Sequence, residues 1–288
     1  MKTTILVTGA TGTVGHGVVK ALGAMKDVQV RAFVRNAAKA QSLEGPNVAI
    51  TQGDLAKKDT IEKALQGVDK VFLLSNADPK QMELQGNVVE AAKKTHVKHI
   101  VKLSALGTSL DSPIKLAQWH RQTEEHIEKS GIPYTHLHPH FFMQNFFMFA
   151  QTIKKDGAFY APMKEAKMSM VDTRDIAHVA ATVLTQTGHE GKTYDITGPE
   201  AVSFNEAAAK LSEVLGKQVK YVPISIDDLK KGMKSMGIED WFVEDMAKLY
   251  EFFNSGKAAF VTPTVLQVTK KPGHSFSQFV KDYTQNFK

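Results

Sequence analysis

The chain contains no cysteine among its 288 residues. Disulfide bonds, thiolate zinc sites, iron–sulfur clusters and a cysteine nucleophile are therefore excluded. A chain without cysteine fits a reducing compartment. The first residues, Met1 to Thr4, lead directly into an apolar segment, without the charged, apolar and cleavage regions of a signal peptide. We therefore expect a cytoplasmic protein.

The sequence also lacks a long apolar run. Its most apolar stretch, residues 141–150, is interrupted by Gln144 and Asn145. A membrane-spanning helix needs about 20 consecutive apolar residues. With 42% hydrophobic and 23% charged residues, the composition is typical of a globular protein. We expect no membrane association.

A concentrated positive charge is missing as well. The net charge is +6, but the lysines occur as separate pairs, for example at residues 57–58 and 270–271. Such pairs are typical of solvated faces and helix C-termini, and no motif for nucleic-acid recognition accompanies them. We expect a small-molecule partner, no nucleic acid, and a monomer or homodimer.

Apolar segments of strand length alternate with helical segments over the first half of the chain. Strands are predicted at residues 5–8, 28–34, 48–51, 70–74, 100–103 and 134–138. Helices are predicted at residues 14–25, 37–43, 57–66, 79–95 and 116–129. Nearly continuous apolar strands in this alternation predict an α/β protein with a doubly wound parallel sheet that helices cover on both faces.

The alternation loosens beyond residue 150. A helix is predicted at 172–185, strands at 193–197 and 217–222, and a capping box from Ser203 to Glu206 opens a helix that ends near Gly216. We expect residues 1–156, with 172–198, to form a nucleotide-binding domain. Residues 157–171 and 199–288 should form a smaller α/β domain over the carboxyl edge of the sheet.

Glycines recur between the first strand and the first helix. Gly9, Gly12 and Gly15 form a G-x-x-G-x-x-G loop. Gly9 permits a tight turn, Gly12 lets the backbone approach a pyrophosphate, and Gly15 lets the helix pack on the strand. The helix N-terminus would then hold the phosphates. The predicted contacts within the loop are Gly9, Ala10, Thr11, Gly12, Thr13 and Val14. A purely structural turn is the alternative.

Two positions after later strands bear on the choice of nucleotide. Arg35 follows the second strand, where an NAD-binding protein usually carries an acidic residue for the ribose 2′-hydroxyl. Arg35, supported by Lys39, suits a 2′-phosphate and predicts NADP(H) over NAD(H); an ordinary surface arginine is the alternative. Asp54 and Leu55 follow the third strand, and Asp54 can either accept from the adenine amine or serve a simple turn.

Further motifs run in order along the chain. They are the loop at residues 8–15, Val34-Arg35, Gly53-Asp54, Leu103-Ser104-Ala105, His120-x-x-x-Glu124, residues 130–135, Phe142-Met143-Gln144-Asn145, residues 171–177 and residues 194–199. With them the sequence resembles the NmrA-like group of atypical short-chain dehydrogenases. Within this group it is similar to type 2 NAD(P)H:quinone oxidoreductases and triphenylmethane-dye reductases, with azoreductases nearby.

The resemblance implies a Rossmann-fold domain, a small C-terminal substrate domain and a two-electron reduction fed by NADPH. The nicotinamide should lie at the carboxyl ends of the later strands. The predicted contacts there are Ser75, Asn76, Ser104, Pro139, His140 and Phe141. The sequence departs from the group in Leu137-His138-Pro139, where Leu-Arg-Pro is usual, and lacks the Ser-Tyr-Lys set of ordinary short-chain dehydrogenases.

The catalytic group is the open question. Only Tyr160 has a lysine four residues on, Lys164, but Pro162 lies between them, so the pair should not share a helix face. His120 and Glu124 do share a helix face, and His120 falls where isoflavone-reductase-like relatives carry a lysine. A histidine oriented by a carboxylate can relay a proton. The alternative is that the pair only holds the loop after Ser104.

The run His136-Leu137-His138-Pro139-His140 resembles a metal pattern. A third, independent ligand is not visible, so we predict no metal and a positional role beside the nicotinamide.

The segment at residues 141–149 is rich in phenylalanine and methionine. A subset can wall a flat acceptor pocket, although an ordinary core explains most of these residues equally well. The predicted substrate contacts are Phe142, Asn145, Met148 and Tyr160. Met163 is a further candidate for the lip opposite them.

Two functions of different classes follow. The first is an NADPH-dependent reductase of quinones or similar planar conjugated acceptors, azo and triphenylmethane compounds included. The second is a non-catalytic sensor that binds NADP(H) and reports to a partner. A sugar-nucleotide epimerase or dehydratase is disfavoured because the Tyr/Lys pair is missing.

Overall fold

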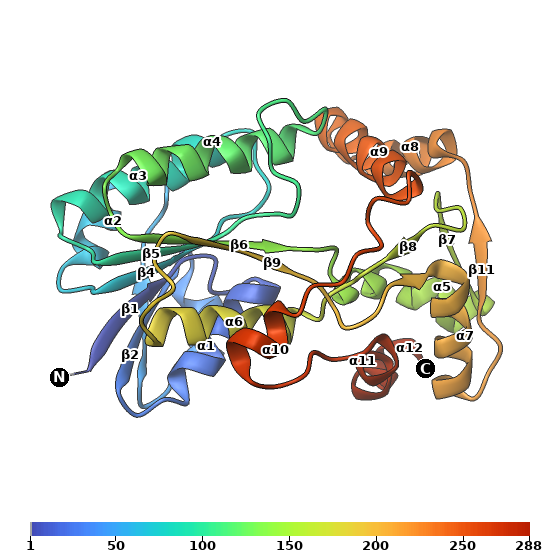
Figure 1. Ribbon diagram of the computed structural model, residues 1–288, viewed down its shortest axis with the longest axis horizontal. Coiled ribbons are helices and arrows are strands. Elements are labelled where there is room, and N and C mark those ends of the chain that lie inside the picture. Colours follow the sequence, from blue (N-terminus) through green and yellow to red (C-terminus); the bar gives the residue numbers. More distant parts are fainter. Residues whose placement is uncertain (1) are drawn as a thin grey trace.

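The computed structural model describes residues 2–288 and is built on one large parallel sheet (Figure 1). The order of its seven strands is β3-β2-β1-β4-β5-β6-β9, and every neighbouring pair is parallel. The strands are β1 (Thr3–Val7), β2 (Val28–Val34), β3 (Val48–Gln52), β4 (Lys70–Leu73), β5 (His99–Leu103), β6 (Tyr134–Pro139) and β9 (Lys192–Ile196). The predicted doubly wound Rossmann-type fold is confirmed.

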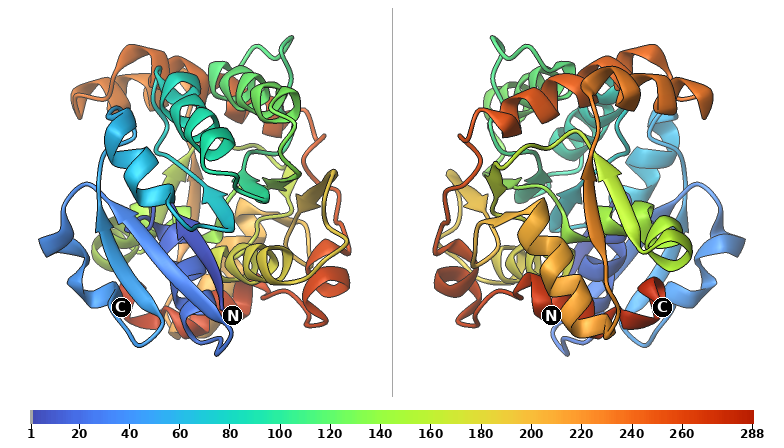
Figure 2. Two further views of the ribbon diagram at one scale, coloured as in Figure 1. Left: turned by 90° about the vertical axis from the view of Figure 1, so that its left-hand side faces the viewer. Right: turned by 90° about the vertical axis from the view of Figure 1, so that its right-hand side faces the viewer.

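Helices cover both faces of this sheet. One face carries α1 (Thr13–Gly23), α6 (Thr173–Thr185) and α10 (Thr264–Thr269), whose apolar residues form a core with β1 and β2. The other face carries α2 (Lys58–Leu65), α3 (Gln81–Lys94) and α4 (Lys115–Lys129). The two layers are seen end-on in Figure 2. A short 3-10 helix, η1 (Ala37–Leu43), follows β2.

The strand order reverses direction between β1 and β4. From β1 the chain continues to β2 and β3 on one side of β1. It then returns to β4, on the other side, and continues to β5 and β6. In such sheets, ligands bind outside the carboxyl ends of the strands at this switch point. The glycine loop between β1 and α1 lies there, because it directly follows the carboxyl end of β1.

The C-terminal part lies beyond the carboxyl ends of the strands (Figure 1). It holds two short sheets, an antiparallel pair of β8 (Lys167–Met168) with β10 (Val202–Ser203) and a parallel pair of β7 (Ala158–Ala161) with β11 (Lys220–Pro223). Its helices are η2 (Met143–Phe149), α5 (Ala150–Asp156), α7 (Phe204–Leu215), α8 (Ile226–Ser235), α9 (Asp240–Asn254), α11 (Phe276–Asp282) and α12 (Thr284–Phe287). The predicted capping box at Ser203 and Glu206 is present.

This part has its own aromatic core. Phe146 is central to it, with ring centroids 4.7 to 5.5 Å from those of Phe149, Phe159, Phe204 and Phe276. The core takes in the 143–156 segment, which we expected in the nucleotide domain, while α10 returns to pack on the main sheet's helices. The short strands β7 and β8 are absent from our sequence expectation. A division into two domains remains our proposal. In it, residues 143–156 move to the C-terminal domain and α10 moves to the nucleotide-binding domain.

The aromatic core supplies a stability prediction. Phe146 is fully buried, whereas Met148, two residues on in η2, is 66% exposed. Phe146→Ala should lower the free energy of unfolding by about 3–5 kcal/mol through lost burial and a cavity, and Met148→Ala by no more than about 0.5 kcal/mol. Urea unfolding of both variants measures the difference. Equal losses would contradict the placement of Phe146 at the centre of this core.

Candidate functional site

The glycine loop is shaped by close backbone approaches. Gly9 has φ +61°, a left-handed conformation that favours glycine. A Cβ on Gly15 would lie 2.1 Å from the Gly9 carbonyl oxygen, so this position tolerates no side chain. A Cβ on Gly12 would contact only that same oxygen, at 3.3 Å, and would otherwise extend into open space. Gly9 and Gly15 therefore shape the loop, while Gly12 keeps the space in front of the helix clear.

The first turn of α1 is left ready for an anion. Its N-cap, Gly12, offers no side chain, and the turn contains no acidic residue. In the described part of the chain, four other α-helices do have side-chain caps: Asp172 on α6, Ser203 on α7, Ser225 on α8 and Ser275 on α11. Uncapped backbone N–H groups and the positive end of the helix dipole suit the phosphates of a dinucleotide. The loop residues present therefore fit the predicted pyrophosphate site.

Arg35 and Lys39 lie at the carboxyl end of β2 and on η1. Both side chains are exposed, and within residues 2–288 neither forms an ion pair. The loop around them is held through other groups: the Gln52 side chain donates to the Arg35 carbonyl, and the Asn36 side chain accepts from the Lys39 N–H. The two positive charges are thus available to a 2′-phosphate.

Asp54 takes part in a local turn. Its Oδ1 accepts from the N–H of Ala56 at 3.0 Å, and its own N–H donates to Thr60 Oγ1. Leu55 packs partly against the core under α2 and α3. The turn alternative for Asp54 therefore has structural support, and an adenine contact for Asp54 or Leu55 stays a prediction.

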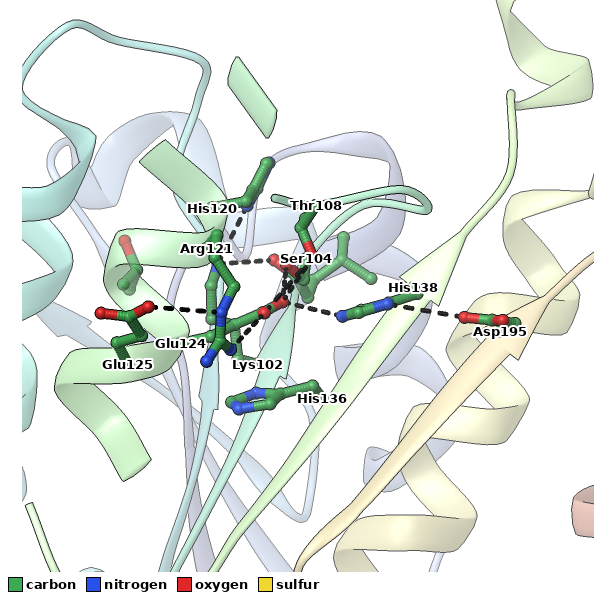
Figure 3. A network of polar contacts seen from close by, with 12 residues as sticks. Lys102, Ser104, Thr108, His120, Arg121, Glu124, Glu125, His136, His138 and Asp195 are labelled. Carbon is green, nitrogen blue, oxygen red and sulfur yellow. Dashed lines mark hydrogen bonds and ion pairs between the residues drawn. The ribbon is translucent and has the colours of Figure 1, made fainter. Parts of the chain in front are cut away.

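A buried carboxylate organises the carboxyl ends of β5 and β6 (Figure 3). Glu124, on α4, accepts hydrogen bonds from the Ser104 hydroxyl after β5 and from His138 Nε2 on β6, the latter at 2.8 Å. Arg121 on α4 and Thr108 in the loop after β5 also donate to it. His138 Nδ1 lies 3.5 Å from the exposed Asp195 carboxylate on β9.

These contacts keep Glu124 ionised. Burial alone would raise the pKa of its carboxyl group, but the hydrogen bonds from His138 and Ser104 outweigh burial and hold the pKa well below its usual range. An ionised carboxylate only accepts hydrogen bonds. The Ser104 proton is therefore directed at Glu124 and away from any bound ligand. His138, where the family usually has arginine, is thus one of the donors to Glu124.

His120 is not oriented by Glu124, which corrects the expectation drawn from their spacing. Its Nδ1 lies 3.2 Å from the Gln81 side-chain nitrogen and 3.1 Å from the Lys102 ammonium. Glu124 is already occupied by its donors from β5, β6 and α4. The alternative is that the pair holds the loop after Ser104. Glu124 does hold this loop, through Ser104 and Thr108, but His120 takes no part in it.

Lys102 and Gln85 are site residues that our sequence analysis missed. Lys102 stands within β5 and is fully buried, and its Nζ donates to Gln85 Oε1 at 3.0 Å. Gln85 in turn donates to the Ser75 hydroxyl at 2.8 Å, which ties the predicted contact Ser75 to this group. The next residue, Asn76, is exposed. A charged residue inside an otherwise apolar central strand was the available signal.

The aromatic side of the site follows β6. His140 is almost fully buried, with its ring 5.9 Å from that of Phe253 on α9 and 6.3 Å from that of Phe260. Phe141 contacts Phe253 edge-on at 5.7 Å. Burial lowers the pKa of His140 to about 4, so the ring is neutral at physiological pH. Pro139 ends β6 directly before this cluster.

The histidine run does not form a metal site in the part of the chain that the structure describes. His136 and His138 approach Glu128 and Glu124 on α4, whereas His140 packs against Phe253. The three rings therefore do not converge on one point.

The predicted substrate residues are spread over different surroundings. Phe142 is half-buried against the core on the α1 and α6 face, and Asn145 is half-buried in η2. Met148 and Tyr160 are exposed, and neither belongs to the aromatic cluster at His140 within residues 2–288. Met163, expected at the lip of the pocket, instead lies in the C-terminal core.

Tyr160 and Lys164 do not form a catalytic pair on a helix. Tyr160 lies on β7, and Lys164 follows in a loop where its N–H donates to Asn254 Oδ1. The expectation that Pro162 keeps Tyr160 and Lys164 from sharing a helix face is confirmed.

The helix that carries His120 and Glu124 is anchored by the C-terminal part. Asp245, buried on α9, accepts from the N–H groups of Lys115 and Leu116 at 3.0 and 2.8 Å, and Lys248 donates to the Pro113 carbonyl. The Asp245 carboxylate caps the first turn of α4, for which no neighbouring side chain serves as a cap. The position of His120 therefore depends on a residue 125 positions further along the chain.

A nucleotide loop, a basic residue after β2 and a polar cluster after β5 and β6 thus occupy one edge of the sheet. The NmrA-like family model matches residues 1–278. The chain belongs to the NmrA-like family.

Several well-covered relatives of this NmrA-like protein have named activities. An NAD(P)H azoreductase of Xenophilus azovorans is 40% identical over 98% of this chain and 99% of its own length. The NADPH complex of a quinone oxidoreductase from Escherichia coli has a TM-score of 0.88 at 32% identity, covering 97% and 99% of the two chains. A triphenylmethane reductase of Citrobacter sp. in complex with NADP(H) has a TM-score of 0.85 at 30% identity, covering 96% and 99%.

The loop geometry predicts a selective loss of nucleotide binding. Gly12 has φ −82°, which any residue adopts, so Gly12→Val should fold normally while its side chain fills the phosphate space. We expect at least about a 100-fold weaker NADPH affinity, because each lost charge-assisted hydrogen bond is worth about 1.5–3 kcal/mol. Titration calorimetry measures it, with Gly232→Val on α8 as the control. Unchanged affinity in Gly12→Val would remove the pyrophosphate from this loop.

The free charge of Arg35 predicts cofactor preference. Arg35→Ala should weaken NADPH binding by about 10- to 100-fold, the value of one charge-assisted hydrogen bond, and leave NADH binding nearly unchanged. Fluorescence titration with both nucleotides provides the internal control. Equal loss for the two would mean that Arg35 contacts a part that they share.

Proposed function

We propose that this NmrA-like protein is an NADPH-dependent reductase that transfers a hydride to quinones or similar planar conjugated acceptors. The observation that carries the proposal is the uncapped, acid-free start of α1 beside an unpaired Arg35. Both features suit a phosphorylated dinucleotide. The named activities of the azoreductase, quinone oxidoreductase and triphenylmethane reductase relatives support the same reaction class.

The cofactor is held along the carboxyl edge of the sheet. The loop at residues 9–14 binds the pyrophosphate, Arg35 with Lys39 binds the 2′-phosphate, and Asp54 and Leu55 flank the adenine. Residues after β4, β5 and β6 surround the nicotinamide: Ser75, Asn76, Ser104, Pro139, His140 and Phe141. When bound, NADPH supplies the hydride.

The class of acceptor is limited by the proton donors that this chain offers. Hydride addition to a simple ketone gives an alkoxide, which needs a strong, positioned proton donor. The Ser104 hydroxyl donates to Glu124, and Tyr160 and Lys164 do not stack as a donor pair. A quinone gives a hydroquinone monoanion whose charge is delocalised, so a weak donor suffices. The half-buried ring of Phe141, directly after β6, offers an apolar surface for such an acceptor.

Phe142, Asn145, Met148 and Tyr160 remain our candidates for the outer part of the acceptor pocket. Phe142 and Asn145 lie one and four residues after Phe141 and are half-buried, so they are the better-placed pair. His120 is the candidate proton donor.

A single assay tests the proposal. The protein mixed with NADPH and 1,4-benzoquinone should oxidise NADPH, whereas aliphatic ketones such as 2-butanone should give no turnover above background. Lys164→Ala should behave as the wild type does, because its side chain has no part in the reaction. Brisk ketone reduction, or collapse of quinone reduction in Lys164→Ala with NADPH binding intact, would overturn the mechanism. NADPH binding without any quinone turnover would favour the sensor hypothesis.

A further inference from the structure

Lys102 is a fully buried lysine that contacts no carboxylate. Its Nζ lies within hydrogen-bond distance of three groups, Gln85 Oε1 at 3.0 Å, the Leu103 carbonyl at 3.1 Å and His120 Nδ1 at 3.1 Å. An ammonium has three N–H donors, and these three acceptors match them. No ion pair involving Lys102 occurs in residues 2–288. Burying an ammonium without a carboxylate is costly, so a structural role alone is a poor reason for this residue.

The surroundings of His120 fix how its ring is protonated. Gln81 Nε2 and Lys102 Nζ both point donors at Nδ1, so Nδ1 is the acceptor. The proton of the neutral ring is therefore on Nε2. Nε2 makes no hydrogen bond within the described chain, and it is not one of the buried polar atoms that lack a partner, so it is accessible. The Nε2–H group is therefore a donor of this cluster that is open to a ligand.

We propose that Lys102 and His120 form a two-residue proton relay, in which His120 Nε2 protonates the reduced acceptor and Lys102 replaces the proton at Nδ1. His120 is then the catalytic residue, and Lys102 acts through it as a positioning and proton-supplying residue. The inference rests on the proposed quinone reduction. Figure 3 shows the His120 ring and the Ser104–Glu124 pair as separate branches of the polar cluster.

The atoms balance through this pair. Transfer of a hydride from NADPH to a benzoquinone leaves a hydroquinone monoanion. The His120 Nε2–H bond then breaks as the phenolic O–H bond forms, and an Lys102 Nζ–H proton moves to His120 Nδ1. The lysine is left as a neutral amine, and a proton from water enters at Nε2 and returns through the ring to Lys102.

The charge environment suits reversible proton transfer. Burial lowers the pKa of Lys102 to about 7, and the negative charge of Glu124 opposes that shift only in part. The pKa of His120 lies well below its ordinary value because of burial and the neighbouring Lys102 charge, so the ring itself stays neutral. A donor whose pKa lies near the working pH both gives and regains a proton readily.

Other titratable groups near Lys102 and His120 come from β6 and α4, and one of them is His138, whose Nε2 lies 2.8 Å from Glu124 Oε1. From β6, His136, the register partner of Lys102, has a pKa lowered to about 4 by burial and is neutral. From α4, Glu124 stays ionised. The elements α3 and β4 contribute only Gln81, Gln85 and Leu73. Lys102 is the buried member of the relay whose pKa lies near neutrality: protonated below about pH 7, it can supply a proton to His120, and deprotonated above that pH, it cannot.

The relay predicts a pH profile for benzoquinone reduction with saturating NADPH. Wild-type kcat should fall as the pH rises from 6 to 8.5, because Lys102 loses its proton. Lys102→Met should lower kcat at pH 6 by about 10- to 100-fold, the lower part of the range for general acid catalysis, and should abolish the fall with pH. His120→Gln should do the same. NADPH affinity, measured by calorimetry, should stay within about twofold in both.

A cationic triphenylmethane dye, crystal violet, adds a second readout. Hydride addition to this carbocation gives a neutral product and consumes no proton, so the ratio of quinone to dye turnover should fall at least about tenfold in both variants. Matched controls replace a lysine and a histidine at the amino ends of two neighbouring strands, away from the relay: Lys70→Met on β4 and His99→Gln on β5 should keep the wild-type profile.

The outcomes separate the two proposals. If wild type reduces benzoquinone but Lys102→Met and His120→Gln keep its kcat and pH profile, the relay is wrong and the proposed function stands. If wild type binds NADPH yet never reduces a quinone, the proposed function fails and the relay with it. Should Lys102→Met not fold, His120→Gln alone decides, because His120 is half-buried and belongs to none of the apolar cores.

Discussion

The buried Glu124 carboxylate is the interaction on which this edge of the sheet depends. It joins α4 to the ends of β5 and β6 by accepting from Ser104 and His138. Charge-assisted hydrogen bonds of this kind are short, directional and about twice as strong as neutral ones. Removing either the carboxylate or its donors would leave unpaired polar groups in a dry environment, which costs more than the bond itself contributes. The strand ends are consequently held in one arrangement.

That arrangement divides the polar groups into two sets with different duties. Ser104, Glu124, His138 and Asp195 lead from the sheet edge toward solvent, and every proton in this set already has an acceptor. Gln81, Gln85, Lys102 and His120 form the other set, which ends in an open ring nitrogen. The first set gives rigidity. The second has a group that changes charge near neutral pH. One small region thus combines a fixed frame with a reversible proton site, and the shared helix α4 keeps them together.

The sequence predicted the features that depend on neighbouring residues and missed the contacts between residues far apart in the chain. The strand–helix alternation and the glycine loop depend on short-range patterns, so the sheet could be inferred from residues 5–138 and the phosphate site from residues 8–15. The spacing of His120 and Glu124 correctly gave one helix face, yet it could not say which strand residues meet that face. Lys102 reaches His120 only because β5 lies beneath α4, a tertiary contact with no local signature. The strands β7 and β8 were missed because four and two residues are too few to show a periodicity.

The cap that Asp245 places on α4 has a consequence for how the chain can be divided. The main sheet is complete at residue 196, and a fragment ending there would keep its glycine loop and both sheet faces apart from α10. It would lose the two hydrogen bonds that begin α4 and the core that supports the segment after β6. Such a fragment would fray at the helix turn next to His120. The glycine loop and Arg35 are thus built within residues 1–196, whereas the start of α4 and the segment after β6 depend on the rest of the chain.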